Sequence, residues 1–507
     1  MHLVAALDTV LGVKPILGLH ETVCSGAADG YARMARKPAM TVLHLGPGLA
    51  NALANMHNAR RAGSPMVNVI GDMATWHKDA DPLLNMDIRA LAQTVSRQVI
   101  TVTPGVEEES MARACDISNS SSVAGQPRIV TLVVPHDVSW SETPPSPIPP
   151  PQHTIKPFTA THQEFLTTLA KELKQYKSKA ALFIGNQAAL SDSLQSIGRI
   201  AVASGCALYC ENSFARLDRG TGLPNLTRLP YFPQDAQAAL SKFEAVVLVD
   251  ARRPVANFGY EGGPSHLIDL PDDHIWELDS SDVDIALAMK FLCTAVGGDA
   301  VTPGVNCGGV FCMPSKVKSP LPPKNGRLNP TYLCQIVAHL QPKDAIIVDE
   351  SLTSGNAYWD ASRGCPPFTH LCLTGGAIGC GPPLAVGAAV ACPERVVINI
   401  QADGSGMYSA QALWTQAREG LRVVTIICAN RTYSILKVEM AKQRITPSNG
   451  AACKSLTELG NPPIDWAKLA NGMGVGAATR AETCEAFIAQ LTAALERPGP
   501  SLIECLL

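Results

Sequence analysis

Two polar residues, each placed directly after an apolar segment, have the chemistry of metal ligands. Asp403 follows closely on the run RVVINIQ (395–401), and Asn430 follows VVTIICA (423–429). Sequential strands usually lie beside each other in a sheet, so this pattern predicts that both residues emerge side by side at one sheet edge. A carboxylate oxygen, an amide oxygen and the backbone carbonyl near Thr432 would form half of an octahedral shell of the kind that Mg²⁺ prefers.

The residues after Asp403 could bind a phosphate group. Gly404 and Ser405 are small and stand where a helix is expected to begin, a position at which free N–H groups and the helix dipole favour an anion. The alternative is that Asp-Gly and Asn-Arg merely form turns after buried strands, because these residues are ordinary turn formers. Their occurrence after two strands, with 25 residues between Gly404 and Asn430, favours the binding site.

Short β-branched runs alternate with segments of helical length along the whole chain. The expected strands are 16–19, 40–45, 66–71, 98–103, 128–134, 180–185, 245–250, 345–350, 395–401, 423–429 and 501–506. Apolar strands separated by helices indicate parallel sheets that are covered on both faces. In such sheets ligands bind beyond the carboxyl ends of the strands, which is where Asp403 and Asn430 are expected.

Two proline-rich stretches divide the 507 residues, a length that implies several domains. Residues 143–151 and 314–324 cannot form a helix or a central strand and are interpreted as extended connectors. The prediction is therefore three doubly wound α/β domains with parallel sheets. Their bounds are 1–142, 158–313 and 326–507, separated by linkers at 143–157 and 314–325.

Composition excludes several classes of function. The chain is 46% apolar and 17% charged, with a net charge of −3 and no basic tract, so we expect no binding to nucleic acid or to an anionic membrane. The sixteen cysteines are scattered without a CxxC pair or a zinc-type cluster, and buried free thiols are the expected state. With no signal peptide or membrane span, we predict a cytoplasmic protein.

The segment from Ala402 to Asn430 resembles the cofactor-binding signature of the thiamine-diphosphate-dependent enzymes. That signature is Gly-Asp-Gly followed by roughly 25 residues and an Asn, and here Ala402 replaces the first glycine. The resemblance implies that thiamine diphosphate and Mg²⁺ are the cofactors. The implied metal ligands are Asp403, Asn430 and Thr432, and the implied diphosphate contacts are Gly404 and Ser405.

Two upstream elements are similar to other parts of the family's site. The turn Thr374–Gly379, with Gly376, is similar to the glycine-rich turn beneath the cofactor, where an apolar residue, here Ile378, holds the two rings in a bent shape. The alternative for Ile378 is a place in the hydrophobic core. Thr353 matches a hydroxyl residue that contacts the diphosphate in the family.

Glu21 begins the segment ETVCSGAADGYAR and is the candidate activating carboxylate. From the pattern alone it could be an exposed glutamate at a helix start. The run Leu19–Arg33, however, resembles the family's activating-glutamate segment, in which the carboxylate hydrogen-bonds the aminopyrimidine ring of the cofactor. In the family this glutamate reaches the diphosphate-binding domain of another subunit. The resemblance therefore implies a homodimer or homotetramer, with 1–142 as the pyrimidine-binding domain and 326–507 as the diphosphate-binding domain.

The chain is most similar to benzoylformate decarboxylases and to short acetolactate-synthase-like proteins. His44 matches a histidine that shuttles protons in the former, although a histidine that caps the following turn is the alternative. The second histidine of benzoylformate decarboxylase is missing, since Asn257 and Phe258 stand in that region. His20 and His57 are expected to be structural. The central domain has no GxGxxG, so FAD is not expected.

Three functions remain open at this stage. The first is a thiamine-diphosphate- and Mg²⁺-dependent decarboxylase and carboligase of pyruvate or a related 2-oxo acid, a lyase or transferase similar to acetolactate synthase. The second is a simple decarboxylase of an aromatic or branched 2-oxo acid, and the third is an inactive paralogue that serves as a structural or regulatory partner. The third is motivated by the N-terminus: family members have about 25 further residues, including a strand, before Met1–Asp8, which is expected to be a helix.

Overall fold

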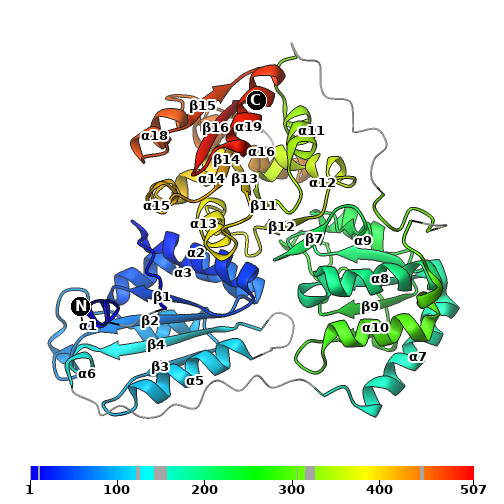
Figure 1. The fold of residues 1–507 in the computed structure, drawn as a ribbon, viewed down its shortest axis with the longest axis horizontal. Helices are drawn as coiled ribbons and strands as arrows, with labels where there is room; N and C mark the ends of the chain where they lie inside the picture. The colour runs from blue at the N-terminus through cyan, green and yellow to red at the C-terminus, as the bar shows by residue number, and fades with distance from the viewer. Residues whose placement is uncertain are drawn as a thin grey trace.

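The computed structural model describes residues 2–9, 12–120, 126–141, 157–304, 307–313, 326–445 and 450–507. Each of three successive parts of the chain is built around its own β-sheet, as Figure 1 shows from blue through green to red. We refer to residues 2–141, 157–313 and 326–507 as the first, second and third parts. The prediction of an α/β fold with parallel sheets is confirmed, while the proline-rich stretches 143–151 and 314–324 lie outside the described residues.

The first sheet has four parallel strands in the order β1-β2-β4-β3. The strands are β1 (Ala39–Leu43), β2 (Met66–Asp72), β3 (Gln98–Thr101) and β4 (Ile129–Pro135). The helices of the first part are α1 (His2–Ala6), α2 (Glu21–Ala35), α3 (Leu45–Ala62), η1 (Lys78–Ala80), α4 (Ile88–Gln93), α5 (Glu107–Asn119) and α6 (His136–Trp140). The expected helix at the start of the chain is therefore present as α1.

The second sheet has five parallel strands in the order β10-β9-β5-β6-β8. They are β5 (Ala180–Ile184), β6 (Ala207–Cys210), β8 (Thr227–Arg228), β9 (Ala245–Val249) and β10 (Ile275–Leu278). The helices are α7 (Ala160–Tyr176), η2 (Lys177–Lys179), η3 (Asn186–Ala189), α8 (Ser191–Ser204), α9 (Pro233–Leu240), η4 (Asp272–His274), α10 (Ile285–Val296) and η5 (Gly298–Ala300).

The third sheet has the strand order β15-β16-β14-β13-β11-β12-β7. Its parallel strands are β11 (Ile346–Glu350), β12 (Phe368–Cys372), β13 (Val397–Ala402), β14 (Val423–Ala429), β15 (Ala478–Ala481) and β16 (Ser501–Leu506). The helices are α11 (Pro330–Leu340), η6 (Leu352–Gly355), α12 (Tyr358–Ala361), α13 (Gly381–Ala391), α14 (Asp403–Gly406), η7 (Met407–Ser409), α15 (Ala412–Arg418), α16 (Ser434–Lys442), α17 (Ala451–Thr457), α18 (Trp466–Gly472) and α19 (Cys484–Glu496).

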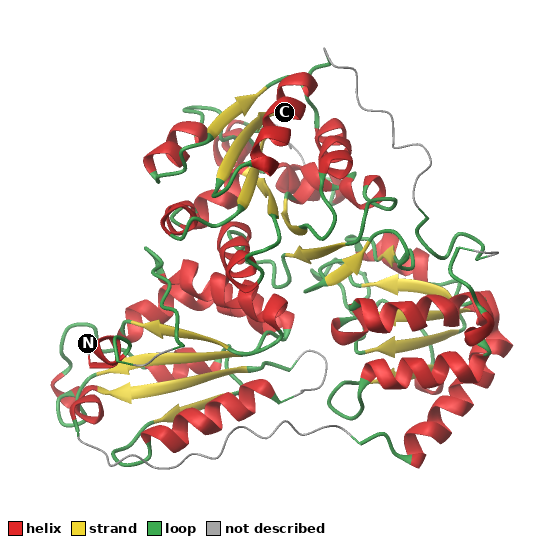
Figure 2. Ribbon diagram, viewed as in Figure 1, coloured by secondary structure: helices red, strands yellow, loops and turns green. Residues whose placement is uncertain are grey.

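The central strands of the sheets, such as β5, β9 and β14, are buried on both faces, and Figure 2 shows the helices that flank them. In β5, Ala180, Leu182 and Ile184 enter one hydrophobic cluster, whereas Ala181 and Phe183 enter the cluster on the opposite face. Successive strand residues point to opposite faces, so a strand that is buried on both must be apolar throughout. This explains the continuous apolar runs of the sequence. Most of the sixteen cysteines are buried as free thiols, as expected.

Two details differ from the sequence prediction. The run at 16–19 was expected to be a strand, but it pairs with no strand, and Leu17 and Leu19 are half exposed. That prediction was wrong, because four apolar residues between Pro15 and His20 have no neighbouring strand to pair with. The third sheet also has an antiparallel edge strand, β7 (Leu217–Arg219), which comes from the second part and pairs with β12.

Helices α2 and α13 join the first part to the third part, and Figure 1 shows them where the blue and yellow regions meet. A Cβ atom on Gly30 would lie 2.1 Å from the carbonyl oxygen of Leu384, and one on Gly387 would lie 1.8 Å from that of Ala27. Only glycine permits this approach of the two backbones. No helix in the described ranges is both long enough and apolar enough to cross a lipid bilayer.

Arg33, on α2, is the polar counterpart of this helix contact. Its buried guanidinium pairs with Asp29 one turn earlier and donates to the carbonyl oxygens of Cys372 at 2.8 Å and Ala215 at 3.1 Å. Arg33 therefore binds all three parts of the chain to one another. Asp29 is also buried, with 1% of its surface exposed, so the two side chains form a buried ion pair.

We predict that Arg33→Met lowers the free energy of unfolding by about 3–5 kcal/mol, because it leaves the Asp29 carboxylate buried without its cation. The measurement is urea unfolding followed by circular dichroism. Lys37→Ala, at an exposed position just after α2, is the matched control and should change stability by less than about 0.5 kcal/mol. Equal effects of the two substitutions would contradict the role given to Arg33.

Candidate cofactor site

The diphosphate side of the candidate site lies where β13 and β14 end. The two strands are parallel neighbours, with Ala402 opposite Cys428, so Asp403 and Asn430 leave the sheet at the same edge. The Oδ2 atom of Asp403 accepts a hydrogen bond from the backbone N–H of Arg431 at 2.7 Å. The expectation that Asp403 and Asn430 emerge side by side is thus confirmed.

Asp403 is a buried carboxylate that forms no ion pair with a side chain of the described residues. Its Oδ1 atom accepts from the N–H of Gly404 at 2.8 Å, and the residue itself begins the short helix α14. Burial raises the pKa of Asp403, against the lowering effect of the hydrogen bonds from Arg431 and Gly404. A carboxylate that is buried and hydrogen-bonded but unpaired is suited to a cation supplied from outside the chain.

The remaining predicted ligands surround Asp403. The Oδ1 atom of Asn430 accepts from the N–H of Thr432 at 3.1 Å, and the carbonyl oxygen of Thr432 accepts from the N–H of Ser434 at 3.0 Å. Each of these oxygens keeps a second lone pair. Ser405 is buried, and its Oγ atom accepts from Gln401 at 2.7 Å. All of these candidate ligand atoms are oxygens, the kind of ligand that Mg²⁺ prefers.

The glycine-rich turn is held from two sides. On one side Asn58, from α3, accepts from the N–H groups of Gly375 at 3.1 Å and Ala377 at 3.3 Å and donates to the carbonyl oxygen of Ala377 at 2.7 Å. On the other side Glu350, the last residue of β11, accepts from the N–H of Gly379 at 2.6 Å. The roles of Asn58 and Glu350 were missed, although a glutamate at the end of the apolar run AIIVDE was a usable signal.

The side chain of Ile378 projects from this clamped turn and is only partly buried. It belongs to none of the hydrophobic clusters of the described residues, so the alternative that it lies in the core is wrong. Gly376 has a φ of +78°, which glycine adopts without strain. Thr353 lies in η6, which packs against α16 and β13, at the same end of the sheet as Asp403.

Glu21 and His44 both lie next to Gly48 on the first part of the chain. Glu21 is the first residue of α2 and is partly exposed, and its Oε2 atom accepts from Asn51 at 3.0 Å. A Cβ atom on Gly48 would lie 3.2 Å from Glu21 Oε1 and 3.6 Å from His44 Cβ, so both candidate catalytic residues flank Gly48. Asn51 and Gly48 had not been singled out in the sequence.

The histidines of this part differ in their contacts. His44 is exposed and makes no side-chain capping bond at the start of α3, so the alternative role as a cap is wrong. His20, by contrast, accepts from the N–H of Thr22 and caps α2, while His57 lies 3.1 Å from the carbonyl oxygen of Gly375. These contacts are those of structural histidines.

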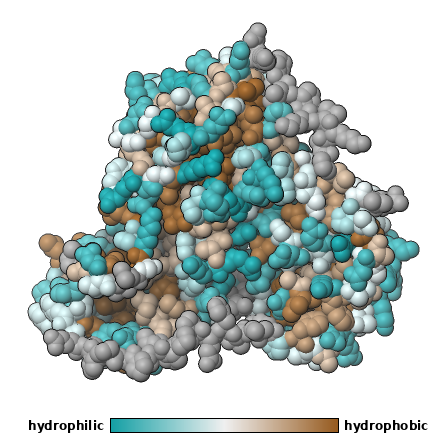
Figure 3. Space-filling model, viewed as in Figure 1, coloured by the Kyte–Doolittle hydropathy of each residue, from teal (hydrophilic) through white to brown (hydrophobic). Residues whose placement is uncertain are grey.

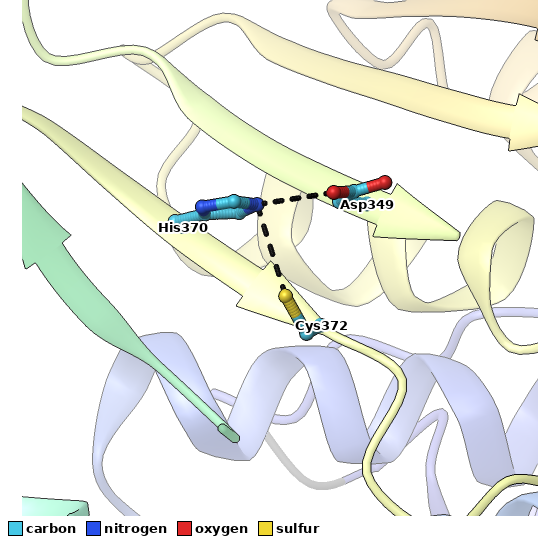
Figure 4. Close-up of side chains that lie close together, drawn as sticks. All are labelled: Asp349, His370 and Cys372. Carbon is cyan, nitrogen blue, oxygen red and sulfur yellow. Dashed lines mark hydrogen bonds and ion pairs between the residues drawn. The ribbon is translucent and has the colours of Figure 1, made fainter. Parts of the chain in front are cut away.

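A second cluster lies on the neighbouring strands β11 and β12 (Figure 4), where Asp349, His370 and Cys372 bring their ligand atoms together. The Nε2 atom of His370 is 3.5 Å from Asp349 and 3.7 Å from the sulfur of Cys372. The Nδ1 atom, however, is 3.3 Å from Arg219, which can only donate. Nδ1 must therefore accept, Nε2 carries the proton, and the ring is not free to bind a metal ion.

Three sheets, a carboxylate and amide pair at one strand edge and a distant helix-starting glutamate together define a cofactor-dependent α/β enzyme. The family model described as "Thiamine pyrophosphate enzyme, N-terminal TPP binding domain" matches residues 1–98, and "Thiamine pyrophosphate enzyme, C-terminal TPP binding domain" matches residues 355–505. The chain belongs to the family of thiamine-diphosphate-dependent enzymes. The two matches fall in the first and third parts of the chain.

Named relatives fall into the two groups that the sequence suggested. The "Putative acetolactate synthase large subunit IlvX" of Mycobacterium tuberculosis is 40% identical over 99% of this chain and 93% of its own length. The benzoylformate decarboxylase of Pseudomonas aeruginosa is 26% identical over 96% of this chain and 91% of its own.

Solved structures share the fold at lower identity. The thiamine diphosphate-dependent 4-hydroxybenzoylformate decarboxylase of Rhodococcus jostii RHA1 superposes with a TM-score of 0.77 at 23% identity, covering 97% of this chain and 91% of its own. The benzoylformate decarboxylase of Polynucleobacter necessarius superposes with a TM-score of 0.78 at 18% identity, covering 99% and 93%. The three-sheet arrangement is therefore that of the family.

The tautomer assigned to His370 generates a prediction about stability against pH. Burial lowers the pKa of His370 to about 4, although Asp349 acts to raise it. The ordinary value is near 6.5, so between these two values the unfolded chain binds a proton that the folded chain does not. Stability should therefore fall as the pH decreases from about 6.5 to 4, by up to about 1.4 kcal/mol per pH unit from this group.

We predict that His370→Gln reduces this pH dependence, since glutamine can also donate to Asp349 and accept from Arg219 without titrating. Urea midpoints measured from pH 7.5 to 4.5 provide the test, with the exposed His266→Gln as the control. Identical slopes in the wild type and His370→Gln, or stoichiometric metal bound at this cluster, would show that the assignment is wrong.

Proposed function

We propose that the protein is a thiamine-diphosphate- and Mg²⁺-dependent decarboxylase and carboligase of a 2-oxo acid such as pyruvate, similar to acetolactate synthase. The observation that carries the proposal is the convergence of Asp403 and Asn430 at one sheet edge in a chain that also has Glu21 at the start of α2. The high identity to the mycobacterial relative supports the acetolactate-synthase type. Glu21 also argues against an inactive paralogue, since binding alone does not need this carboxylate.

The residues of the third part would hold the charged end of the cofactor. Asp403, Asn430 and the carbonyl oxygen of Thr432 would bind Mg²⁺, and Ser405 and the N–H groups near the start of α14 would face the diphosphate. When bound, thiamine diphosphate supplies an electron-accepting ring that makes loss of CO₂ from a 2-oxo acid possible. The clamped turn around Ile378 would support its rings.

Glu21 would act from a second subunit. Within one chain, no hydrogen bond or ion pair of the described residues joins Glu21 to Asp403, Asn430 or Ser405. Exposed apolar side chains lie next to both halves of the site, including Leu17 and Leu19 before α2 and Leu436 on α16. In Figure 3 hydrophobic residues lie among hydrophilic ones on the face shown, as on most protein surfaces. We propose a homodimer in which each Glu21 completes the partner's site.

In this arrangement Glu21 would hold a proton on the aminopyrimidine ring, and His44 would exchange protons with the reacting substrate. Both side chains flank Gly48, and both are open to a ligand because Glu21 is partly exposed and His44 is exposed. Simple decarboxylation of an aromatic 2-oxo acid is the second candidate. It is favoured by His44 and by the similarity to benzoylformate decarboxylase.

The substrate can be determined with thiamine diphosphate, Mg²⁺ and a panel of 2-oxo acids, with CO₂ and products measured by mass spectrometry. Acetolactate from pyruvate supports the first candidate, whereas an aldehyde as the only organic product supports the second. Tight cofactor binding without turnover of any substrate, also in a chain with an N-terminal extension taken from a relative, would support the inactive paralogue.

We predict that Glu21→Gln lowers kcat by at least about a hundredfold while the Kd for the cofactor changes little, because the carboxylate acts on a proton rather than on the diphosphate. Glu419→Gln is a suitable control, since this partly exposed glutamate forms ion pairs with Lys14 and Arg418 away from the candidate site residues. Retention of activity in Glu21→Gln would remove Glu21 from the mechanism.

Co-expression of Glu21→Gln and Asp403→Asn chains tests the arrangement between subunits. If Glu21 acts on the partner's site, each mixed dimer contains one intact site, and the mixture should recover about a quarter of wild-type activity. If Glu21 acts within its own chain, no mixed dimer contains an intact site. The mixture would then be as inactive as either variant alone.

We predict that Asp403→Asn abolishes Mg²⁺-dependent binding of thiamine diphosphate. In the wild type, Mg²⁺ should bind more weakly at acidic pH, because the raised pKa of Asp403 lets protons compete with the cation. Titration calorimetry at pH 5.5 and 7.5 measures both effects. Wild-type affinity for the cofactor and Mg²⁺ in Asp403→Asn would mean that Asp403 is not the metal ligand.

A further inference from the structure

Glu350 is a buried carboxylate that sits directly beneath the glycine-rich turn. It is the last residue of β11, and only 1% of its surface is exposed. Its Oε1 atom accepts from the N–H groups of Gly379 at 2.6 Å and Cys380 at 3.3 Å. Its Oε2 atom accepts from the N–H of Gly381 at 2.7 Å and from the side chain of Gln401 at 3.0 Å.

This carboxylate has no cationic partner in the described chain. Burial raises the pKa of Glu350, and the influences that oppose burial are the hydrogen bonds from Gly381, Gln401, Gly379 and Cys380. Burying a carboxylate without a counter-ion is costly unless its oxygens are fully hydrogen-bonded. Three converging backbone N–H groups and one amide provide these bonds. The turn and the carboxylate therefore stabilise each other, and the side chain of a neutral amide could not accept hydrogen bonds from all four donors.

The position of Ile378 depends on the bonds at each side of it. Ala377, the residue before it, is bonded to Asn58 through both its N–H and its carbonyl oxygen. Gly379, the residue after it, is bonded to Glu350. The backbone on both sides of Ile378 is thus fixed, one side by the first part of the chain and the other by the third sheet.

Gln401 links the same carboxylate to the diphosphate loop. It lies opposite Glu350 in the register of β11 and β13, and it donates both to Glu350 and to Ser405 Oγ at 2.7 Å. The loop after β13 also has bonds of its own, between Asp403 and the N–H groups of Gly404 and Arg431. Loss of the Glu350 charge should consequently disturb the turn more than the diphosphate loop.

We propose that Glu350 is a positioning residue for the cofactor, which holds the 378–381 backbone so that Ile378 presents its side chain to the cofactor rings. This inference rests on the proposed function. It gives the glutamate a role distinct from that of Asp403: Asp403 would bind the charged end of thiamine diphosphate, and Glu350 shapes the surface on which the rings rest.

The test variant is Glu350→Gln, which keeps the size of the side chain. In either orientation of the new amide, its NH₂ group faces a donor, because Gly379 and Cys380 donate on one side and Gly381 and Gln401 on the other. The turn must then move. Glu504→Gln is the matched control, since Glu504 is also fully buried in the third sheet but pairs with Arg480 at 3.0 Å on the strands away from the turn.

Two ligands separate the ring side of the site from the diphosphate side. Thiamine diphosphate has both, whereas inorganic pyrophosphate with Mg²⁺ has only the charged end. We expect Glu350→Gln to bind thiamine diphosphate at least about tenfold more weakly, which is about 1.4 kcal/mol, and pyrophosphate within about threefold of the wild type. Glu504→Gln should lower the melting temperature of the protein while leaving both affinities within about twofold.

Each outcome of the calorimetric titrations either supports or overturns the role proposed for Glu350. A selective loss of thiamine diphosphate in Glu350→Gln supports the proposal. Unchanged affinity in that variant overturns it, and so does an equal loss of both ligands, or a similar loss in Glu504→Gln, since these would reflect general destabilisation. Failure of the wild type to bind thiamine diphosphate overturns the proposed function itself, and this inference with it.

Discussion

The contact between α2 and α13 is the constraint that places the rest of the site. Glu21 begins α2, and the glycine-rich turn leads directly into α13, so the packing of these helices sets how the two cofactor elements of one chain are related. The backbones approach so closely that Gly30 and Gly387 admit no side chain. Arg33 adds the polar bonds that join this contact to the second part of the chain. A shift of one helix against the other would change the position of the turn relative to Glu21 at the start of α2.

The buried acids of the third sheet differ in the groups that form hydrogen bonds or ion pairs with their carboxylates. Glu504 pairs with Arg480, and Asp349 is hydrogen-bonded by His370 and Ser351, while Glu350 relies on backbone N–H groups. Asp403 has two such N–H bonds and free lone pairs at the edge of the sheet. Both oxygens of Glu350 are hydrogen-bonded within the chain, whereas the Oε1 atom of Glu504 is buried without a hydrogen-bond partner among the described residues. Asp403 differs from the other three in its place, because it leaves the sheet at the same edge as Asn430.

The second part of the chain contributes to the third more than its own sheet suggests. Its strand β7 forms the edge of the third sheet, and Arg219 on that strand stacks 3.8 Å from the ring of Trp359. Near the candidate site, the phenol of Tyr260 donates to Glu439 on α16 at 3.0 Å. Because α16 follows the Asn430 loop, this bond joins the second part of the chain to the element that comes after the candidate metal ligands.

The sequence by itself determined the fold class and indicated the candidate site residues. Asp403 and Asn430 were predictable because each directly follows the end of an apolar strand. Parallel strands that lie side by side bring such ends together. Glu21, Ile378 and His44 were identified from short sequence motifs, because the order of neighbouring residues can be compared without knowledge of the fold. What only the tertiary structure decided were partners distant in sequence: Asn58 against the turn, β7 in the third sheet, and Arg219 against His370. Such contacts leave no local periodicity. For the same reason the run 16–19 resembled a strand. Its apolar residues are visible in the sequence, whereas the lack of a neighbouring strand is visible only in the tertiary structure.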